Sequence, residues 1–97
     1  MYELPNNFTG VIKFYLPRCG PCKMLNAGAW PRLIEANPDI TFLDCDTGKS
    51  PNQAKQNKIE AVPTVVFFKN GLEVWRVSGG QQQDKYQEAI DLKLKAS

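Results

Sequence analysis

Two cysteines three positions apart, Cys19 and Cys22, are the residues of this sequence best suited to chemistry. They follow the apolar run at residues 11–16 and open a stretch with helical periodicity. A thiol at the start of a helix lies near free backbone N–H groups and the positive end of the helix dipole, which favour a thiolate. A second thiol about one turn further along is close enough to resolve a mixed disulfide. The pair therefore predicts thiol–disulfide exchange.

Structural thiols or half of a zinc site are the alternatives for this pair. A zinc site needs about four ligands, and here only Cys45 and carboxylates remain, since the chain has no histidine. The sequence therefore predicts no metal. Cys45 lies at the end of the predicted strand at residues 40–45, and its neighbours in the chain are Asp44 and Asp46. A small buried core residue is the favoured interpretation of Cys45, and a regulatory thiol is the alternative.

Composition limits the possible classes of protein. Ninety-seven residues predict one small domain, residues 1–97. The net charge of +2 is scattered, which argues against nucleic-acid binding. No apolar run approaches the roughly 18–20 residues that span a membrane, and the first residues lack a basic leader and an apolar signal core. An odd number of cysteines argues against a disulfide scaffold. We expect a monomer in the reducing cytoplasm.

Hydrophobic periodicity and turn residues predict the order β-α-β-α-β-β-α. The predicted strands are residues 11–15, 40–45, 65–68 and 73–77, the last two joined by a hairpin at Asn70-Gly71. The first predicted helix runs from Pro21 to about residue 36, with a kink or break at Pro31. A second runs from a Ser50 cap to about Asn57, and the last from an Asp84 cap to Leu94. A further helical turn is predicted at residues 4–8. Tyr86, Ile90 and Leu94 form the buried stripe of the last helix. Parallel crossovers followed by a hairpin predict an α/β fold, a mixed four-stranded sheet with helices on both faces.

From Val11 to Leu94 the chain resembles the thioredoxin family. The matching segments are Cys19-Gly20-Pro21-Cys22-Lys23-Met24, Val62-Pro63-Thr64, Phe68-Lys69-Asn70-Gly71 and Gly79. Each segment is modest alone, but their order and spacing together make the resemblance specific. It implies the thioredoxin fold and the reduction of protein disulfides. It also implies recycling by a flavin-dependent thioredoxin reductase, with no permanently bound cofactor.

The resemblance implies roles for individual residues. Cys19 would be the exposed nucleophile and Cys22 the buried resolving thiol. The Val62–Pro63 peptide bond would be cis, beside the dithiol, where an extended substrate would be held as an added strand. Gly79 would leave room for that substrate to approach.

The sequence also departs from the family's pattern. The family's N-terminal edge strand is expected to be missing, since only 18 residues precede Cys19. Lys13 stands where the family has a buried acid, and Arg18 replaces a tryptophan. With Gly20 and Pro21, these residues are expected to tune the active site. The positive charge of Arg18 could attract the Cys19 thiolate and lower its pKa. The alternative is that Arg18 is a solvated charge near the helix start, screened by water and salt.

For Lys13 the favoured interpretation is a packed stem whose amine reaches water, Asp44 or Asp46, and the alternative is a catalytic amine with a depressed pKa. Two rival functions remain open for the whole chain. One is a glutathione-dependent, glutaredoxin-like reductase, against which Gly20-Pro21 argues. The other is a non-catalytic binding module, which the missing edge strand, Lys13 and Arg18 fit.

Overall fold

A computed structural model of the chain describes residues 7–95, so most of the predicted turn at residues 4–8 lies outside the described part. Its strands are β1 (Gly10–Tyr15), β2 (Phe42–Asp46), β3 (Thr64–Lys69) and β4 (Leu72–Ser78). Its helices are α1 (Gly20–Ala27), α2 (Ala29–Ala36), α3 (Pro51–Gln56) and α4 (Gln83–Ala89), which continues as the π-helical segment η1 (Ile90–Lys95).

The strands form the mixed four-stranded sheet that was predicted, and their order across the sheet is β2-β1-β3-β4. β1 runs parallel to β2 and antiparallel to β3, and β3 and β4 form the predicted hairpin. Asn70 and Gly71 have positive φ angles of 54° and 83°, the backbone that a tight hairpin turn requires. Within residues 7–95 the sheet has four strands, with β2 and β4 at its edges.

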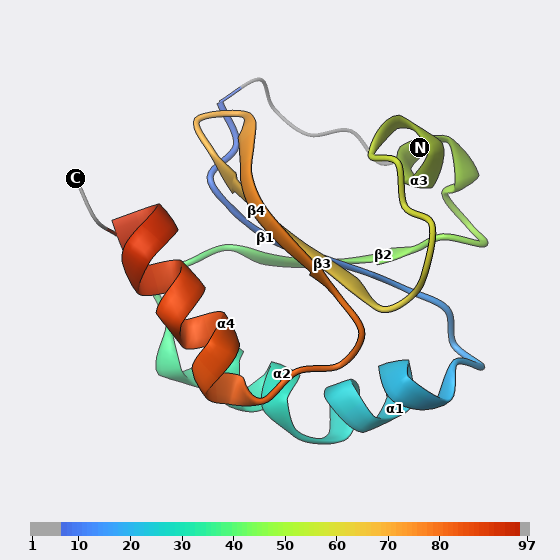
Figure 1. The fold of residues 1–97 in the computed structure, drawn as a ribbon, viewed down its shortest axis with the longest axis horizontal. Coiled ribbons are helices and arrows are strands. Elements are labelled where there is room, and N and C mark those ends of the chain that lie inside the picture. Colours follow the sequence, from blue (N-terminus) through green and yellow to red (C-terminus); the bar gives the residue numbers. More distant parts are fainter. Residues whose placement is uncertain (1–6, 96–97) are drawn as a thin grey trace.

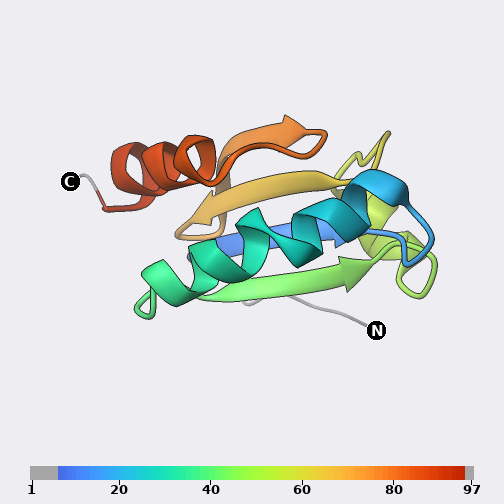
Figure 2. The same ribbon diagram turned by 90° about the horizontal axis from the view of Figure 1, so that it is seen from below.

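Helices cover both faces of the sheet, as Figures 1 and 2 show: α1, α2 and α4 lie on one side and α3 on the other. The core on the first side joins residues of β1 and β3 to the apolar faces of the three helices. Its buried members are Val11, Leu25, Trp30, Leu33, Val65, Phe67, Tyr86, Ala89, Ile90 and Leu94. The stripe predicted for the last helix is therefore confirmed. The core on the second side is made of Phe8, Ile12, Phe14, Cys45, Val66 and Phe68.

The first long helix breaks at Gly28, three residues before the predicted position at Pro31. Pro31 has no N–H to donate to the carbonyl of Ala27, four residues earlier, and its ring would clash with that carbonyl. The interruption therefore falls one turn ahead of the proline, and Pro31 itself lies in the first turn of α2.

Two helix caps also differ from the prediction. Ser50 occupies the N-cap of α3, but its side chain makes no capping hydrogen bond, and its interaction with Cys45 lowers the pKa of that thiol. α4 begins at Gln83 with Gln82 as its cap, so Asp84 lies in the first turn. There its negative charge suits the positive end of the helix dipole.

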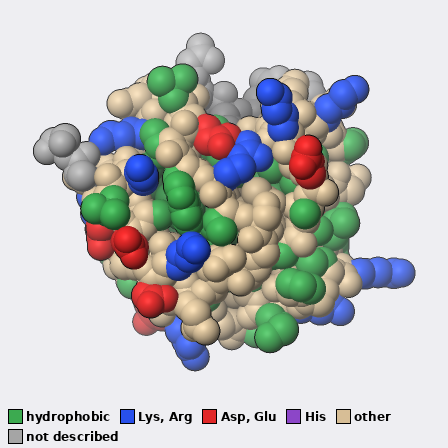
Figure 3. Space-filling model, viewed as in Figure 1, with side chains coloured by type: hydrophobic (Ala, Val, Ile, Leu, Met, Phe, Trp, Pro, Cys, Tyr) green, Lys and Arg blue, Asp and Glu red, His purple; other side chains and the backbone are tan. Residues whose placement is uncertain are grey.

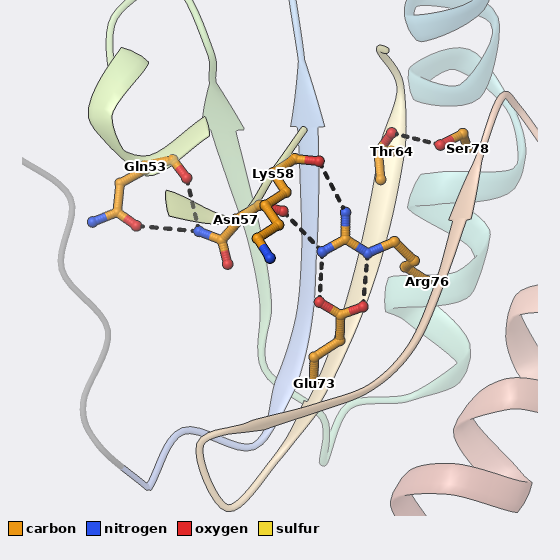
Figure 4. A network of polar contacts seen from close by, with 7 residues as sticks. All are labelled: Gln53, Asn57, Lys58, Thr64, Glu73, Arg76 and Ser78. Atoms are coloured by element: carbon orange, nitrogen blue, oxygen red, sulfur yellow. Dashed lines mark hydrogen bonds and ion pairs between the residues drawn. The ribbon is translucent and has the colours of Figure 1, made fainter. Parts of the chain in front are cut away.

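Arg76 on β4 ties the sheet to the end of α3 (Figure 4). Its guanidinium donates to both carboxylate oxygens of Glu73, at 2.7 and 2.5 Å. It also donates to the carbonyl oxygens of Asn57 and Lys58, at 2.8 and 3.3 Å. The start of the loop between α3 and β3 is therefore held against the sheet.

Thr64 holds the other end of that loop. Its hydroxyl donates to the carbonyl oxygen of Ala61 at 2.7 Å and lies 2.9 Å from the hydroxyl of Ser78 (Figure 4). Because both ends are anchored, the intervening residues, which include Val62 and Pro63, have a defined position beside α1.

Candidate active site

Cys19 is the N-cap residue of α1, immediately after the turn that follows β1. Its sulfur accepts a hydrogen bond from the N–H of Cys22 at 3.3 Å, and its carbonyl accepts the N–H of Lys23 at 3.0 Å. Pro21 occupies the first turn, where its missing N–H costs no hydrogen bond. The sulfur of Cys19 therefore faces the free N–H groups at the helix start.

The two thiols differ in exposure. Cys19 is partly exposed, whereas Cys22 is buried, with 1% of its surface exposed. Burial is the main cause that raises the pKa of the Cys22 thiol, and its contact with Cys19 raises that pKa further. Both cysteines are free, so the structure represents the dithiol form.

The loop before β3 reaches the exposed sulfur. The thiol of Cys19 donates to the carbonyl oxygen of Val62 at 3.6 Å. The Val62–Pro63 peptide bond is cis, which confirms the expectation. Gly79, after β4, has a φ angle of 81° and donates its N–H to the carbonyl oxygen of Pro63 at 2.8 Å. The structure thus brings Cys19, Val62, Pro63 and Gly79 together.

A groove begins at this corner and runs between α1, α2 and the start of α4. It is lined by Pro21, Met24, Leu25, Gly28, Ala29, Arg32, Gly79 to Asp84, Gln87, Glu88, Asp91 and Leu92. Met24 is 77% exposed and Leu92 is 62% exposed. Apolar side chains gather over α1 on the face drawn in Figure 3, while charges of both signs are interspersed elsewhere on it.

Lys13 lies beneath α1, with 1% of its surface exposed. Its ammonium donates to the side-chain oxygen of Asn26 and lies 3.5 Å from a carboxylate oxygen of Asp44. The rings of Tyr15 and Trp30 flank it, with centroids at 5.2 and 4.8 Å. Burial lowers the pKa of Lys13, and Asp44 opposes that shift. The favoured interpretation is a packed stem whose amine reaches water, Asp44 or Asp46, and of these partners the structure shows Asp44.

The remaining predicted residues take simpler positions. Arg18 is exposed and forms no hydrogen bond or ion pair with any residue in the described range. Gly20 is open to solvent, since a Cβ there would meet nothing within 4 Å. Cys45 is 2% exposed in the core on the opposite side of the sheet, so it is a core residue, and burial raises the pKa of its thiol.

Asn26, near the dithiol, was not singled out from the sequence. It follows Cys22 by four positions, a spacing that places both on one face of α1 and that could have indicated it. The indole N–H of Trp30 donates to Asp44 at 3.0 Å. Gly80 lies near the carbonyl oxygen of Pro21.

Residues 7–95 contain no cluster of three or more His, Cys, Asp or Glu residues placed to hold a metal ion. The helices in this part of the chain are all too short or too polar to cross a membrane.

A partly exposed thiol and a buried thiol thus lie at one helix start, beside a cis-proline loop. Comparison with known proteins places the chain more narrowly. The family model described as Thioredoxin matches residues 3–92. The chain belongs to the thioredoxin family, whose members are protein-disulfide oxidoreductases.

Individual relatives agree with this placement. Mitochondrial thioredoxin-3 of Saccharomyces cerevisiae is 42% identical over 69 residues, which cover 71% of this chain and 54% of that relative. Thioredoxin of Chlamydia trachomatis is 38% identical over 74 residues, covering 76% of this chain and 72% of the relative. The match thus spans about half the length of the yeast protein. The crystal structure of oxidised yeast thioredoxin 3 superposes with a TM-score of 0.79 at 36% identity, covering 88% of this chain and 78% of that one.

Proposed function

We propose that this chain reduces disulfides in other proteins, with Cys19 as the nucleophile and Cys22 as the resolving thiol. The observation that carries this proposal is the arrangement of the two cysteines. The sulfur of Cys19 is partly exposed at the N-cap of α1 and accepts the N–H of Cys22, whose own thiol is buried directly behind it.

The reaction follows from thiol chemistry. The Cys19 thiolate attacks one sulfur of a substrate disulfide, the substrate S–S bond breaks, and the leaving thiolate takes a proton from water. Cys22 then loses its proton and attacks the sulfur of Cys19 in the mixed disulfide. The second substrate thiolate leaves, so the substrate gains two electrons while Cys19 and Cys22 become a disulfide.

Val62, Pro63 and Gly79 are proposed to hold the substrate by its main chain. An extended segment could add to this corner as a short strand, replacing the contact of Cys19 with the carbonyl of Val62. Gly20 presents no side chain beside Cys19, which leaves the sulfur accessible. Pro21 and the apolar surface over α1 would contact the substrate next to the scissile bond, and Arg18 would carry an exposed charge beside it.

A flavin-dependent thioredoxin reductase is the proposed recycling partner. We place the protein in a reducing compartment, the cytoplasm, because thiol–disulfide exchange of this kind requires the dithiol to be regenerated. The relatives include a mitochondrial protein. Residues 1–97 are proposed to act as one domain and as a monomer, since the residues assigned to the site lie on elements and loops that join or cover one sheet.

Insulin reduction tests the proposal. With NADPH and thioredoxin reductase the chain is expected to precipitate insulin, whereas Cys19→Ser is expected to abolish this activity and Cys45→Ser to keep it. Turnover with glutathione and glutathione reductase but not with thioredoxin reductase would indicate a glutaredoxin-like reductase instead. Biological function retained by a Cys19→Ser, Cys22→Ser double variant would indicate a binding module.

A further inference from the structure

Lys13 is a buried charge that the steps above do not use. It is 1% exposed, and its ammonium is enclosed by Asn26, Asp44 and two aromatic rings. Burying an ammonium is costly unless polar partners compensate for the lost water. Because the chain carries this cost within the core beneath α1, the position of the charge calls for a physical explanation.

Asn26 locates that charge relative to the dithiol. Cys22 and Asn26 lie four positions apart in α1, so their side chains leave the same face of the helix about one turn apart. The ammonium of Lys13 binds the side-chain oxygen of Asn26. It therefore lies about one helical turn from the sulfur of Cys22, on the side where Cys22 is buried.

Asp44 does not cancel this charge. Its carboxylate is 52% exposed, lies 3.5 Å from the ammonium and also accepts the indole N–H of Trp30. Water therefore screens the carboxylate far more than it screens the lysine. The other titratable groups facing Lys13 and Cys22 are Tyr15 on β1 and Cys19 at the start of α1. Of these groups, Lys13 alone brings a positive charge.

We propose that Lys13 is a positioning residue for the resolving step, in which its ammonium stabilises the negative charge that forms on the sulfur of Cys22 before Cys22 attacks Cys19. This inference rests on the proposed function, because it assigns a role within the same exchange reaction. It agrees with the direction of the electrostatic coupling: Lys13 lowers the pKa of Cys22, and Cys22 raises the pKa of Lys13.

Removing the charge of Lys13 is expected to slow the resolving step at low pH and to speed it at high pH. Suppose that removal of the charge raises the pKa of Cys22 by one unit. Below both pKa values there is then about tenfold less thiolate, but each thiolate is a stronger nucleophile, so resolution slows by about three- to fourfold. Above both pKa values the thiol is fully ionised in either protein, and the variant resolves about threefold faster. A loss of structure would slow resolution at every pH.

The experiment compares the parent chain with Lys13→Met, which keeps the stem and removes the charge. Lys13→Arg keeps a charge, and Lys55→Met removes an exposed lysine of α3 as a matched control. The pKa of Cys22 is followed by its 13Cβ chemical shift in the reduced protein. The resolving rate is the second phase of thionitrobenzoate release when the reduced protein reacts with dithiobis(nitrobenzoate) in stopped flow. Urea unfolding shows which variants are folded.

We expect Lys13→Met to raise the pKa of Cys22 and to give a rate profile that crosses that of the parent. Lys13→Arg and Lys55→Met should follow the parent. An unchanged Cys22 pKa in Lys13→Met, an equal slowing at all pH values, or a folded Lys13→Arg that behaves like Lys13→Met would overturn the proposal.

If Lys13→Met does not fold, Asn26→Asp tests the same idea, since Asn26 is exposed and the new carboxylate would neutralise the ammonium in place. A raised Cys22 pKa is expected there, and an unchanged one overturns the inference. Failure of the proposed function would be distinct, because the parent chain would then show no second phase and no Cys19–Cys22 disulfide.

Discussion

The sulfur of Cys19 lies 3.6 Å from the carbonyl oxygen of Val62, although the two residues are 43 positions apart in the chain. Val62 precedes Pro63, whose carbonyl accepts the N–H of Gly79. Three segments that are distant in sequence therefore meet at the exposed thiol: the start of α1, the loop before β3 and the residue after β4. The site depends on the whole sheet being formed.

The three cysteines are expected to differ in their reaction with iodoacetamide at neutral pH. Cys19 is partly exposed, whereas Cys22 and Cys45 are 1% and 2% exposed and burial raises the pKa of both. Because the thiolate is the reactive form, Cys19 should be modified more than about tenfold faster. Mass spectrometry of peptides taken over time measures the three rates. In urea the difference should disappear, and equal modification of Cys45 and Cys19 in the folded protein would contradict the structure.

Gly79→Ala is expected to lower the free energy of unfolding by about 1–2 kcal/mol, because a φ angle of 81° is unfavourable for any residue with a Cβ. Gly80→Ala is the matched control in the same loop. A Cβ at Gly80 would lie 3.7 Å from the carbonyl oxygen of Pro21, an ordinary contact, so its effect should stay within about 0.5 kcal/mol. Urea titration measures both, and equal stabilities of the two variants would refute the prediction.

Gly10→Ala is expected to destabilise the fold by about 1–3 kcal/mol through overpacking. A Cβ at Gly10 would lie 2.5 Å from the carbonyl oxygen of Thr41 and 2.7 Å from the ring of Phe8. The first of these atoms is backbone, so relief requires a shift between β1 and the start of β2. Gly20→Ala, whose Cβ would meet open space, is the control. Equal urea midpoints for the two variants would count against this close approach.

Glu73→Gln is expected to destabilise the protein at neutral pH but not in acid. The hydrogen bond from Arg76 is the main cause that lowers the pKa of Glu73 below its ordinary value of 4.5. A depressed carboxyl pKa stabilises the fold above the unfolded value, and the contribution is lost as pH falls through the folded value. Since the side chains of Arg76 and Glu73 are 31% and 38% exposed, we expect about 0.2–1 kcal/mol.

Urea unfolding as a function of pH checks this linkage. The stability difference between the parent and Glu73→Gln should be largest near neutrality and should close as Glu73 becomes protonated. Glu35→Gln, at an exposed glutamate of α2, should show no such closing difference. A difference for Glu73→Gln that persists unchanged in acid would show that charge is not its source.

Local patterns were enough to predict the architecture. The strands were visible as β-rich runs, and Asn70-Gly71 marked the hairpin that the structure contains. The cysteine pair was placed correctly at a helix start, because a proline two residues after Cys19 favours the first helical turn. Each of these features depends on neighbours in the chain, so the sequence alone carries the information.

Features that depend on contacts between elements were missed. The break at Gly28 follows from the clash of Pro31 with a carbonyl one turn earlier, so the cause and its effect lie at different positions. Ser50 makes no capping hydrogen bond but affects the pKa of Cys45, which β2 brings near it. The partner of Lys13 on α1 depends on how the helix crosses the sheet, which no periodicity specifies. Arg76 reaches carbonyls eighteen and nineteen residues away for the same reason.

The position of β2 at the edge of the sheet bears on whether copies of the protein can associate with one another. In the range that the structure describes, β2 pairs with β1 alone, so its other flank presents backbone donors and acceptors to its surroundings. Such a flank is a template on which another copy could extend the sheet into an aggregate. Asp44 and Asp46 place two like charges on this strand of five residues. Pairing two copies along this flank would bring those charges together, and the repulsion between them would oppose such an association.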